Sequence, residues 1–460
     1  MNILYIGSGF VGTCSAAVSA DSGHTVLVYD IDKKKIAALG SHDRDTIEKC
    51  LHEKGLGDLL VRSKDRITFT HDYVDVIEFL EDTQAIFMCL PTPEIGETGE
   101  SDLTYYRNAA ETLAKALAKR NGGEQSEYIV IVNKSTVPIT MVDQTQEILD
   151  AHGVKNVGVV SNPEFLVEGK AVEGSLKPNR VVVGAWEEKD FAVMRNVYER
   201  FLQATDVPYF EVNPKEAAAG KLLANYYLFN RLAVCFDVIG RTCESFDDVS
   251  FEQLRKIMTS DERIGTWGFY DSLYAGGSCF IKDARSLSHQ LQTAGANTSM
   301  VQETYLANKR QLKHFLSRAR AEAGVDWSGK RVGVLGLAFK RDTNDTRNSP
   351  SIDIVQTLLE ENVAELKLYD PVASDMFQAQ FPASEQITYT SNEREAIADV
   401  DVVIISTDWP QFQRVADMLL QRTGEKRQLI MDGRRSLSHK YIELHDAGYT
   451  ILPVGGRYLS

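Results

Sequence analysis

The sequence has few cysteines, few prolines and no excess of positive charge. Its six cysteines, among 460 residues, lie far apart and form no Cys-x-x-Cys pair, so neither a zinc site nor a disulfide framework is indicated. With 12 prolines, 43% hydrophobic and 25% charged residues, the chain is typical of a folded protein of two or three domains, not of a disordered one. The formal net charge of −15 disfavours nucleic acid or an anionic membrane as the main partner. Any anionic substrate therefore needs a local basic pocket.

Targeting and membrane-spanning segments are also missing from the sequence. Residues 1–7 contain no basic residue and their apolar run ends at Gly7, which argues against a signal peptide. No uninterrupted apolar stretch approaches membrane-spanning length. We therefore expect a cytoplasmic protein that contacts no membrane and holds no metal.

The order of apolar and helical segments predicts an α/β fold with a helical middle. Residues 1–212 open with a β-α-β pattern at 2–6, 11–22 and 25–30, and further strand-like runs follow at 85–90, 128–132, 157–160 and 180–184. Residues 213–324 have helical patterning without a convincing strand. Residues 325–460 return to strand-like runs, at 327–335, 363–370, 400–406 and 428–432. We expect three domains with these boundaries.

A dinucleotide site is predicted where the first strand meets the first helix. The segment Gly7-Ser8-Gly9-Phe10-Val11-Gly12 lets a pyrophosphate approach the backbone and the N-terminus of the helix. Asp30 ends the next strand, where it would accept hydrogen bonds from the adenosine ribose and repel a 2′-phosphate, so NAD is favoured over NADP. Lys35 follows as a weaker ribose candidate, since a solvated helix face explains the run Lys33-Lys34-Lys35 better. A glycine turn that binds nothing is the alternative, and this context disfavours it.

Two later strand ends carry threonines, Thr92 before Pro93 and Thr136 in the segment 134–138. The carboxyl edge of such a sheet is where ligands bind, so we assign both to the cofactor site. Threonine next to proline is also an ordinary loop start.

A reactive cysteine is predicted at a helix N-terminus. In Gly276-Gly277-Ser278-Cys279-Phe280-Ile281-Lys282-Asp283, the helix start and Lys282 both stabilise a thiolate on Cys279. Asp283 would cap the helix or orient a water and a catalytic side chain. Inert packing is the usual role of a lone cysteine, and the neighbouring glycines, lysine and carboxylate argue against it here.

Together with the segments 162–169, 216–225 and 336–347, these motifs resemble the UDP-glucose 6-dehydrogenases in order, from residue 2 to about 435. The resemblance implies two Rossmann-like doubly wound domains joined by a long central helix, with NAD on the first and the UDP of the substrate on the second. It also implies two hydride transfers from C6 of a UDP-hexose, with Cys279 holding the sugar as a thiohemiacetal and then a thioester.

The resemblance assigns roles to single residues. Lys221 and Asn225, one helical turn apart, would stabilise the oxyanion at C6, and Thr136, Glu164 and Asp283 would orient a water. It implies that Lys282 also contacts the cofactor. It implies substrate contacts from Glu164, Phe165, Leu166, Glu168, Lys221, Asn225, Gly276, Phe280, Lys340 and Arg434. Glu168 matches either a substrate contact or an acid–base partner, and the resemblance leaves open which carboxylate is the general base. Arg263 matches an arginine that reaches the sugar of a neighbouring subunit, so we expect at least a dimer.

Departures from the family pattern lie near the sugar. Leu273-Tyr274-Ala275 replaces the usual Phe-Gly-(Phe or Tyr), which would move an aromatic wall of the hexose pocket by one residue, and Ile281 and Asn179 also differ. UDP-glucose is therefore the first expectation, and GDP-mannose or another nucleotide sugar is the alternative. A catalytically silent nucleotide-sugar sensor would require loss of the chemical residues, all of which are present. A simple hydroxyacid dehydrogenase would need neither a second α/β domain nor a nucleophilic cysteine.

Overall fold

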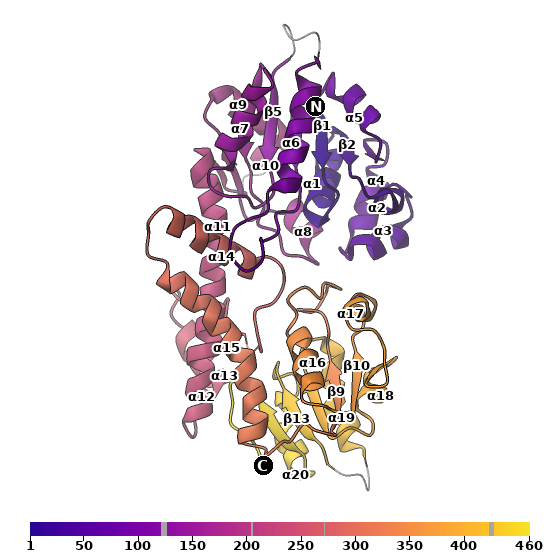
Figure 1. Ribbon diagram of the computed structural model, residues 1–460, viewed down its shortest axis with the longest axis vertical. Helices are drawn as coiled ribbons and strands as arrows, with labels where there is room; N and C mark the ends of the chain where they lie inside the picture. Colours follow the sequence, from indigo (N-terminus) through magenta and orange to yellow (C-terminus); the bar gives the residue numbers. More distant parts are fainter. Residues whose placement is uncertain (121–126, 204–205, 271, 423–426) are drawn as a thin grey trace. The chain divides into compact units, whose positions relative to one another are not determined.

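The computed structural model describes residues 1–120, 127–203, 206–270, 272–422 and 427–460. The chain forms two compact units, Met1–Ala224 and Asn225–Ser460. The long helix α11 (Pro214–Val234) contributes residues to both (Figure 1).

The first unit is built on an eight-stranded sheet with the strand order β3-β2-β1-β4-β5-β6-β7-β8. Neighbouring strands pair in parallel, apart from an antiparallel bridge between Ser161 of β6 and Gly184 of β7. The strands are β1 (Asn2–Ile6), β2 (Thr25–Tyr29), β3 (Ile67–Thr70), β4 (Ala85–Met88), β5 (Ile129–Asn133), β6 (Val157–Ser161), β7 (Val181–Gly184) and β8 (Tyr209–Val212).

Helices cover both faces of this sheet, because alternate residues of its central strands point to opposite sides. Ile3 and Tyr5 of β1 join one hydrophobic cluster, whereas Leu4 and Ile6 join another. The helices are α1 (Phe10–Asp21), α2 (Lys33–Leu39), α3 (Arg44–Leu51), α4 (Leu56–Arg62), α5 (Tyr73–Leu80), α6 (Thr104–Leu117), α7 (Met141–Ala151), α8 (Ala171–Leu176), α9 (Glu188–Val197) and α10 (Glu199–Gln203).

The strand order of the first unit reverses between β1 and β4. In doubly wound sheets, ligands bind outside the carboxyl ends of the strands at this reversal. The segments that follow β1, β4 and β5 carry Gly7, Thr92 and Thr136, so the topology brings the three predicted cofactor segments to one edge of the sheet.

The second unit contains a six-stranded parallel sheet with the order β11-β10-β9-β12-β13-β14. Figure 1 shows α16, α17, α18 and α19 around strands of this sheet. The strands are β9 (Arg331–Leu335), β10 (Glu365–Tyr369), β11 (Ile387–Tyr389), β12 (Val402–Ile405), β13 (Leu429–Asp432) and β14 (Thr450–Pro453). The helices associated with it are α16 (Pro350–Glu360), α17 (Ser374–Gln380), α18 (Glu393–Ile397), η3 (Pro410–Arg414), α19 (Val415–Leu420), η4 (Ser438–Lys440) and α20 (Tyr441–Asp446).

Helices fill the described part of 213–324, which contains no strand. Beyond α11 they are the π-helical segment η2 (Cys235–Gly240), α12 (Arg241–Ser245), α13 (Phe251–Thr259), α14 (Phe280–Thr293) and α15 (Ser299–Ala321).

One helical stretch is both long and apolar. Among the described residues, Pro214–Ser245 is the one helix long and apolar enough to cross a membrane, and 44% of its most apolar window is buried inside the protein. Core helices satisfy the same criteria of length and composition. Lys221, Arg231 and Asp237 divide this stretch, so it contains no uninterrupted apolar run of membrane-spanning length.

The predicted α/β class is confirmed, and each predicted strand is present. Four strands, β3, β8, β11 and β14, were not predicted, and all four lie at the edges of the two sheets.

Candidate active site

The turn between β1 and α1 leaves backbone accessible to an anion. The N–H of Gly7, whose φ is +102°, donates to the carbonyl of Tyr29 at 2.8 Å. A Cβ at Gly7 would lie 2.3 Å from the carbonyl oxygen of Cys89, and one at Gly12 would lie 2.1 Å from that of Gly7, so both positions require glycine. At Gly9, the N-cap of α1, a Cβ would meet no atom within 4 Å, and no side chain caps the helix. The first N–H groups of α1 are therefore left for a ligand such as a pyrophosphate.

Asp30 lies beside this turn as an ionised carboxylate. Its Oδ2 accepts the N–H of Ser8 at 2.8 Å and the hydroxyl of Ser8 at 2.7 Å, and its Oδ1 accepts the N–H of Asp32 at 3.0 Å. Burial favours a higher pKa for Asp30, but these bonds and the Lys35 ammonium at 3.7 Å hold the pKa below its usual value. A charged carboxylate here suits a ribose diol and repels a 2′-phosphate.

The two threonine loops are joined directly. The hydroxyl of the buried Thr92 donates to the carbonyl of Thr136 at 2.8 Å, and the hydroxyl of Ser135 donates to the carbonyl of Leu90 at 2.7 Å. The segments after β4 and β5 therefore form one surface at the edge of the sheet.

A buried ion pair joins α11 to the segment after β6. The Nζ of Lys221 lies 3.1 Å from the Oε1 of Glu164, and the two side chains are 5% and 10% exposed. The other carboxylate oxygen of Glu164 accepts the N–H of Leu166, and the Lys221 ammonium lies 5.4 Å from the centre of the Phe165 ring. Four residues that were assigned to the sugar thus contact one another.

In the second unit, Cys279 stands at the N-terminus of α14, and it is exposed. One turn into that helix, the N–H of Asp283 donates to the carbonyl of Cys279 at 2.8 Å. The Asp283 carboxylate, 1% exposed, accepts from the amide of Asn225 at 2.6 Å and from the ammonium of Lys282 at 2.7 Å. Cys279 therefore stands at a helix start. Asn225, Lys282 and Asp283, which were predicted to act with it, are joined to one another by hydrogen bonds to the Asp283 carboxylate.

The glycines before Cys279 pack against the segment after β9. A Cβ at Gly276 would lie 2.3 Å from the carbonyl oxygen of Asn348, and one at Gly277 would lie 2.8 Å from the ring of Phe339. The N–H of Gly277 donates to the carbonyl of Arg347 at 3.2 Å, and its carbonyl accepts from the Asn348 amide at 3.1 Å. The fold therefore brings the cysteine motif and the segment 336–347 together.

Basic side chains lie near this loop. The guanidinium of Arg434 donates to the Ser272 hydroxyl at 2.5 Å and to the Asp408 carboxylate at 2.8 Å. Burial favours a higher pKa for Asp408, but Arg434 and Arg341 lower it below its usual value. Lys340 lies over the ring of Phe339, 5.6 Å from its centre. These residues provide the local positive charge that an anionic substrate requires.

Three family models match consecutive parts of the chain. All three describe the UDP-glucose/GDP-mannose dehydrogenase family: its NAD binding domain at residues 1–202, its central domain at 215–310 and its UDP binding domain at 333–439. UDP-glucose 6-dehydrogenase TuaD of Bacillus subtilis is 33% identical over 98% of this chain and 93% of its own length. UDP-glucose 6-dehydrogenase AglM of Haloferax volcanii is 32% identical over 96% and 98%. The chain belongs to the UDP-glucose/GDP-mannose dehydrogenase family.

Solved structures of similar fold agree with this assignment. A UDP-glucose dehydrogenase from Pyrobaculum islandicum aligns with a TM-score of 0.84 at 27% identity, over 95% of each chain. A UDP-D-ManNAc dehydrogenase from Pyrococcus horikoshii aligns with a TM-score of 0.79 over 99% of each chain, and at 22% identity it bears on the fold alone.

Members of the UDP-glucose/GDP-mannose dehydrogenase family are NAD-dependent nucleotide-sugar dehydrogenases, and the cofactor of this chain is NAD. The site fits that cofactor, because Gly7 and Gly12 keep the turn free of side chains and Asp30 is charged.

The second unit of this dehydrogenase has a similar glycine turn after its strand β9, but the carboxylate beside that turn is differently hydrogen-bonded. The N–H of Gly336, whose φ is +96°, donates to the carbonyl of Tyr369 at 2.8 Å, as Gly7 does to Tyr29. Asp370 follows β10 as Asp30 follows β2. However, its carboxylate accepts four backbone N–H groups and the indole N–H of Trp409. A carboxylate offers about four lone-pair positions. Asp370 is therefore saturated and has none left for a ribose, whereas the match to the NAD binding domain covers residues 1–202, which include the first turn.

Three other predicted residues of the dehydrogenase have the following surroundings. The side chain of Arg263 is 85% exposed, and its guanidinium pairs with Asp261 at 2.6 Å. Phe280 stacks on Phe229, with the ring centres 6.3 Å apart. Glu168 is half-buried in the turn before α8.

Two buried residues that position predicted segments were not found from the sequence. Glu53 is fully buried and accepts the N–H groups of Gly169 and Ala171 at 2.7 and 2.8 Å, which holds the turn that carries Glu168. Lys134 donates to Asn162 at 2.9 Å. Glu53 stands in a polar stretch without a motif. In the segment that contains Lys134, the sequence pattern pointed to Thr136 and not to the lysine.

Tyr274 corrects the expected shift of the aromatic wall. Its side chain is 7% exposed and lies in the hydrophobic core of the second unit. Burial raises its pKa, with a further contribution from Asp353. The ring of Tyr274 therefore packs in the hydrophobic core of the second unit.

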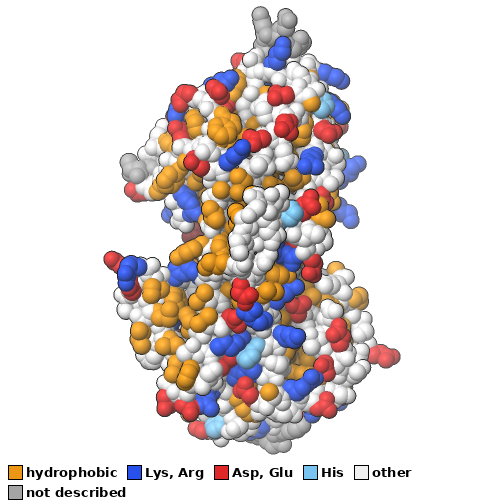
Figure 2. Space-filling model, turned by 60° about the vertical axis from the view of Figure 1, so that its left-hand side comes forward, with side chains coloured by type: hydrophobic (Ala, Val, Ile, Leu, Met, Phe, Trp, Pro, Cys, Tyr) orange, Lys and Arg blue, Asp and Glu red, His pale blue; other side chains and the backbone are white. Residues whose placement is uncertain are grey.

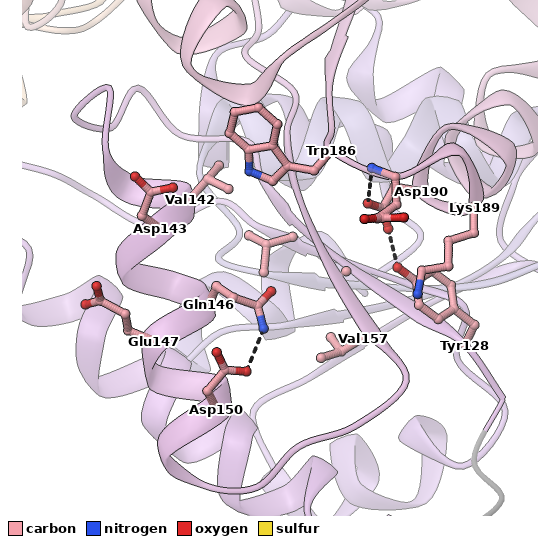
Figure 3. Close-up of a pocket in the computed structure, with 13 residues that line it drawn as sticks. Tyr128, Val142, Asp143, Gln146, Glu147, Asp150, Val157, Trp186, Lys189 and Asp190 are labelled. Atoms are coloured by element: carbon pink, nitrogen blue, oxygen red, sulfur yellow. Dashed lines mark hydrogen bonds between the residues drawn. The ribbon is translucent and has the colours of Figure 1, made fainter.

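A cavity of about 370 Å³ lies elsewhere in the first unit (Figure 3). Figure 3 shows Asp143, Glu147 and Asp150 along one helix, across the hollow from Asp190 and Lys189. With five carboxylates and one ammonium in its lining, this cavity is unsuited to an anionic nucleotide sugar. None of the residues predicted for the site lines it.

Proposed function

We propose that this dehydrogenase oxidises C6 of UDP-glucose to a carboxylate, giving UDP-glucuronate, with two NAD consumed per sugar. The observation that carries the proposal is the exposed thiol of Cys279 at the start of α14, one helical turn before Asp283, whose carboxylate accepts hydrogen bonds from Asn225 and Lys282. The relatives TuaD and AglM, whose names specify UDP-glucose, support the choice of sugar. Because residues 273–275 depart from the family pattern, GDP-mannose and other nucleotide sugars are the alternative substrates to assay.

The bound NAD supplies the hydride acceptor in each of the two oxidations. In the first, the C6 hydroxyl gives its proton to the water that Thr136, Glu164 and Asp283 orient, C6 gives up a hydride, and an aldehyde results. The thiolate of Cys279, favoured by the positive end of α14, then adds to the aldehyde carbon and forms a C–S bond. Lys221 and Asn225, one turn apart on α11, stabilise the resulting oxyanion with an ammonium and an amide N–H.

The second oxidation removes a hydride from C6 of this thiohemiacetal and leaves a thioester on Cys279. A water, oriented by Thr136, Glu164 and Asp283, attacks the thioester carbon, and the C–S bond breaks. The carboxylate leaves and the thiolate is restored. Phe165, Leu166, Glu168, Gly276, Phe280, Lys340 and Arg434 are proposed to contact the substrate, and Lys35, Thr92 and Lys282 the cofactor.

We further propose three domains, at 1–212, 213–324 and 325–460, and a cytoplasmic homodimer. The dimer is supported by the exposed side chains of Tyr227, Val234 and Val238, which follow one face of the helix that continues from α11. Figure 2 shows hydrophobic side chains gathered on the face that it brings forward. Arg263, exposed and held only within its own loop by Asp261, is available to a neighbouring subunit.

The decisive test counts NADH formed per sugar for the purified protein and for Cys279→Ser. We expect two NADH per UDP-glucose, because the aldehyde stays on the thiol for the second oxidation. Cys279→Ser should lose at least about a thousandfold in kcat, since a serine hydroxyl is a far weaker nucleophile at neutral pH. Turnover with a different nucleotide sugar alone would refute UDP-glucose and keep the mechanism. Full activity of Cys279→Ser would refute the covalent route.

A further inference from the structure

Lys134, which follows β5, carries a buried ammonium group without an ionic partner. The residue is 7% exposed. Its Nζ donates to the amide oxygen of Asn162 at 2.9 Å and to the hydroxyl of Tyr198 at 3.3 Å. Among the residues that the structure describes, no carboxylate oxygen lies within 4.0 Å of this ammonium. Burying a charge against neutral partners costs several kcal/mol. We therefore expect the Lys134 ammonium to have a function that offsets this cost.

The ammonium fixes the orientation of Asn162, which is 1% exposed. The amide oxygen of Asn162 accepts from Lys134 and also from the Tyr198 hydroxyl at 2.5 Å. With its oxygen held on that side, its amide nitrogen donates to the carbonyl of Val182 at 2.7 Å. Its backbone N–H donates to the carbonyl of Asn133 at 3.0 Å. Asn162 thereby ties the end of β5 to β7, immediately before Pro163 and Glu164.

Lys134 lies close to groups that the proposed reaction uses. It lines a cavity of about 70 Å³ together with Glu164, Phe165 and Arg180. Burial raises the pKa of the Cys89 thiol to about 12, while Lys134 lowers it and Glu164 raises it, so both charges act at this one thiol. The carboxylate of Glu164 is already paired with Lys221. The cavity therefore has an excess of positive charge directly behind the Glu164–Leu166 segment.

We propose that Lys134 is a positioning residue of the oxidation, an inference that rests on the proposed function. Its ammonium holds Asn162, and through it the Glu164–Leu166 segment, in the place where that segment meets the substrate. An apolar side chain of the same length would fill the space at lower cost but would not hold Asn162. Lys134 thus lowers the stability of the fold and raises the activity of the enzyme.

The test is Lys134→Met, which keeps the length of the side chain and removes the charge. We expect Tm to stay unchanged or rise by about 2 °C or more, because replacing a buried charge with an apolar group of similar volume is neutral or stabilising. We expect kcat to fall at least tenfold, with the KM for NAD within twofold of its original value. Lys115→Met, at an exposed position of α6, is the matched control and should change neither quantity.

A second variant separates positioning from simple packing. Tyr198→Phe removes one acceptor of the ammonium, which should lower Tm by about 2–4 °C. Adding Lys134→Met to Tyr198→Phe should lower both Tm and kcat below those of either single variant, because the buried amide oxygen of Asn162 then lacks both of its side-chain donors. The inference is overturned if Lys134→Met keeps kcat within threefold, or if it lowers Tm by more than about 4 °C in parallel with kcat. Turnover by the unmodified enzyme is measured first: its absence refutes the proposed function, and the unfolding temperatures still decide whether the charge of Lys134 destabilises the fold.

Discussion

Asp30 is the residue that we expect to select between the two nicotinamide dinucleotides. Its carboxylate is held ionised by Ser8, Asp32 and Lys35. Replacing it with alanine removes a charged acceptor for the ribose, and hydrogen bonds to charged groups contribute about 1.5–3 kcal/mol. We therefore expect Asp30→Ala to raise the KM for NAD about tenfold or more and to lower the KM for NADP. Steady-state kinetics with both cofactors measures this, with Asp45→Ala, an exposed residue at the start of α3, as the control. Unchanged selectivity would place the ribose away from Asp30.

At the residue scale, the sequence revealed residues whose role depends on their immediate neighbours. Gly7, Asp30 and Cys279 each stand at a strand end or a helix start that local patterning predicts. Lys134 and Glu53 escaped notice because their roles depend on distant partners, 28 residues away for Asn162 and 116 for Gly169. Tyr274 was misjudged for the same reason. An aromatic side chain in a glycine-rich loop gives no sign of whether it turns toward a ligand or into the core.

The turn between β1 and α1 is the element in which tolerance to an added side chain can be tested most directly. A Cβ at Gly12 would stand 2.1 Å from the Gly7 carbonyl, whereas one at Gly9 would meet nothing within 4 Å. Gly12→Ala should therefore destabilise the protein by about 1–3 kcal/mol, roughly 2–10 °C in Tm. Gly9→Ala should keep Tm within about 2 °C and still weaken NAD binding, because its methyl group occupies the space above the helix N-terminus. Calorimetric unfolding and NAD titration measure both. Normal NAD affinity in Gly9→Ala would contradict a pyrophosphate at this position.

At the element scale, whether a strand could be predicted from the sequence depended on how its residues are buried in the sheet. Central strands such as β1, β5 and β12 are nearly continuous apolar runs because helices cover both of their faces. The missed strands β3, β8, β11 and β14 each have a neighbour on one side only. β8 illustrates the reason, since none of its four residues is buried and its sequence therefore carries no apolar pattern. The π-helical segment after α11 also leaves no signature, because its residues suit an α-helix equally well.

The molecule as a whole is an acidic chain that takes an anionic substrate, and its charge is distributed accordingly. The formal charge is −15, yet Lys340, Arg341 and Arg434 gather near the loop that leads to Cys279, opposed there by Asp408. The net charge thus opposes an anion at long range, while the basic side chains attract it at close range. The order of motifs along the chain was enough to predict the family. The resemblance pointed to Arg263 as a residue that reaches a partner subunit, but the exposed apolar face at Tyr227, Val234 and Val238 could not be predicted, because exposure becomes known only once the chain is folded.

The assembly is tested at the exposed face of the helix that continues from α11. The side chains of Tyr227, Val234 and Val238 are 65%, 42% and 57% exposed and follow one face at helical spacing. We expect the unmodified protein to have twice the mass of one 51.3 kDa chain by light scattering. Val238→Glu should shift it to the mass of a single chain, because an unpaired charge buried in an apolar interface costs several kcal/mol.

The matched control is Ile442→Glu on α20. That side chain is 75% exposed and lies outside the proposed interface, so the variant should keep the mass of the unmodified protein. Since Arg263 is proposed to reach the sugar of the neighbouring subunit, the single-chain form of Val238→Glu should also lose sugar turnover while it retains NAD binding. A monomeric unmodified protein with full activity would contradict both the interface and the role of Arg263.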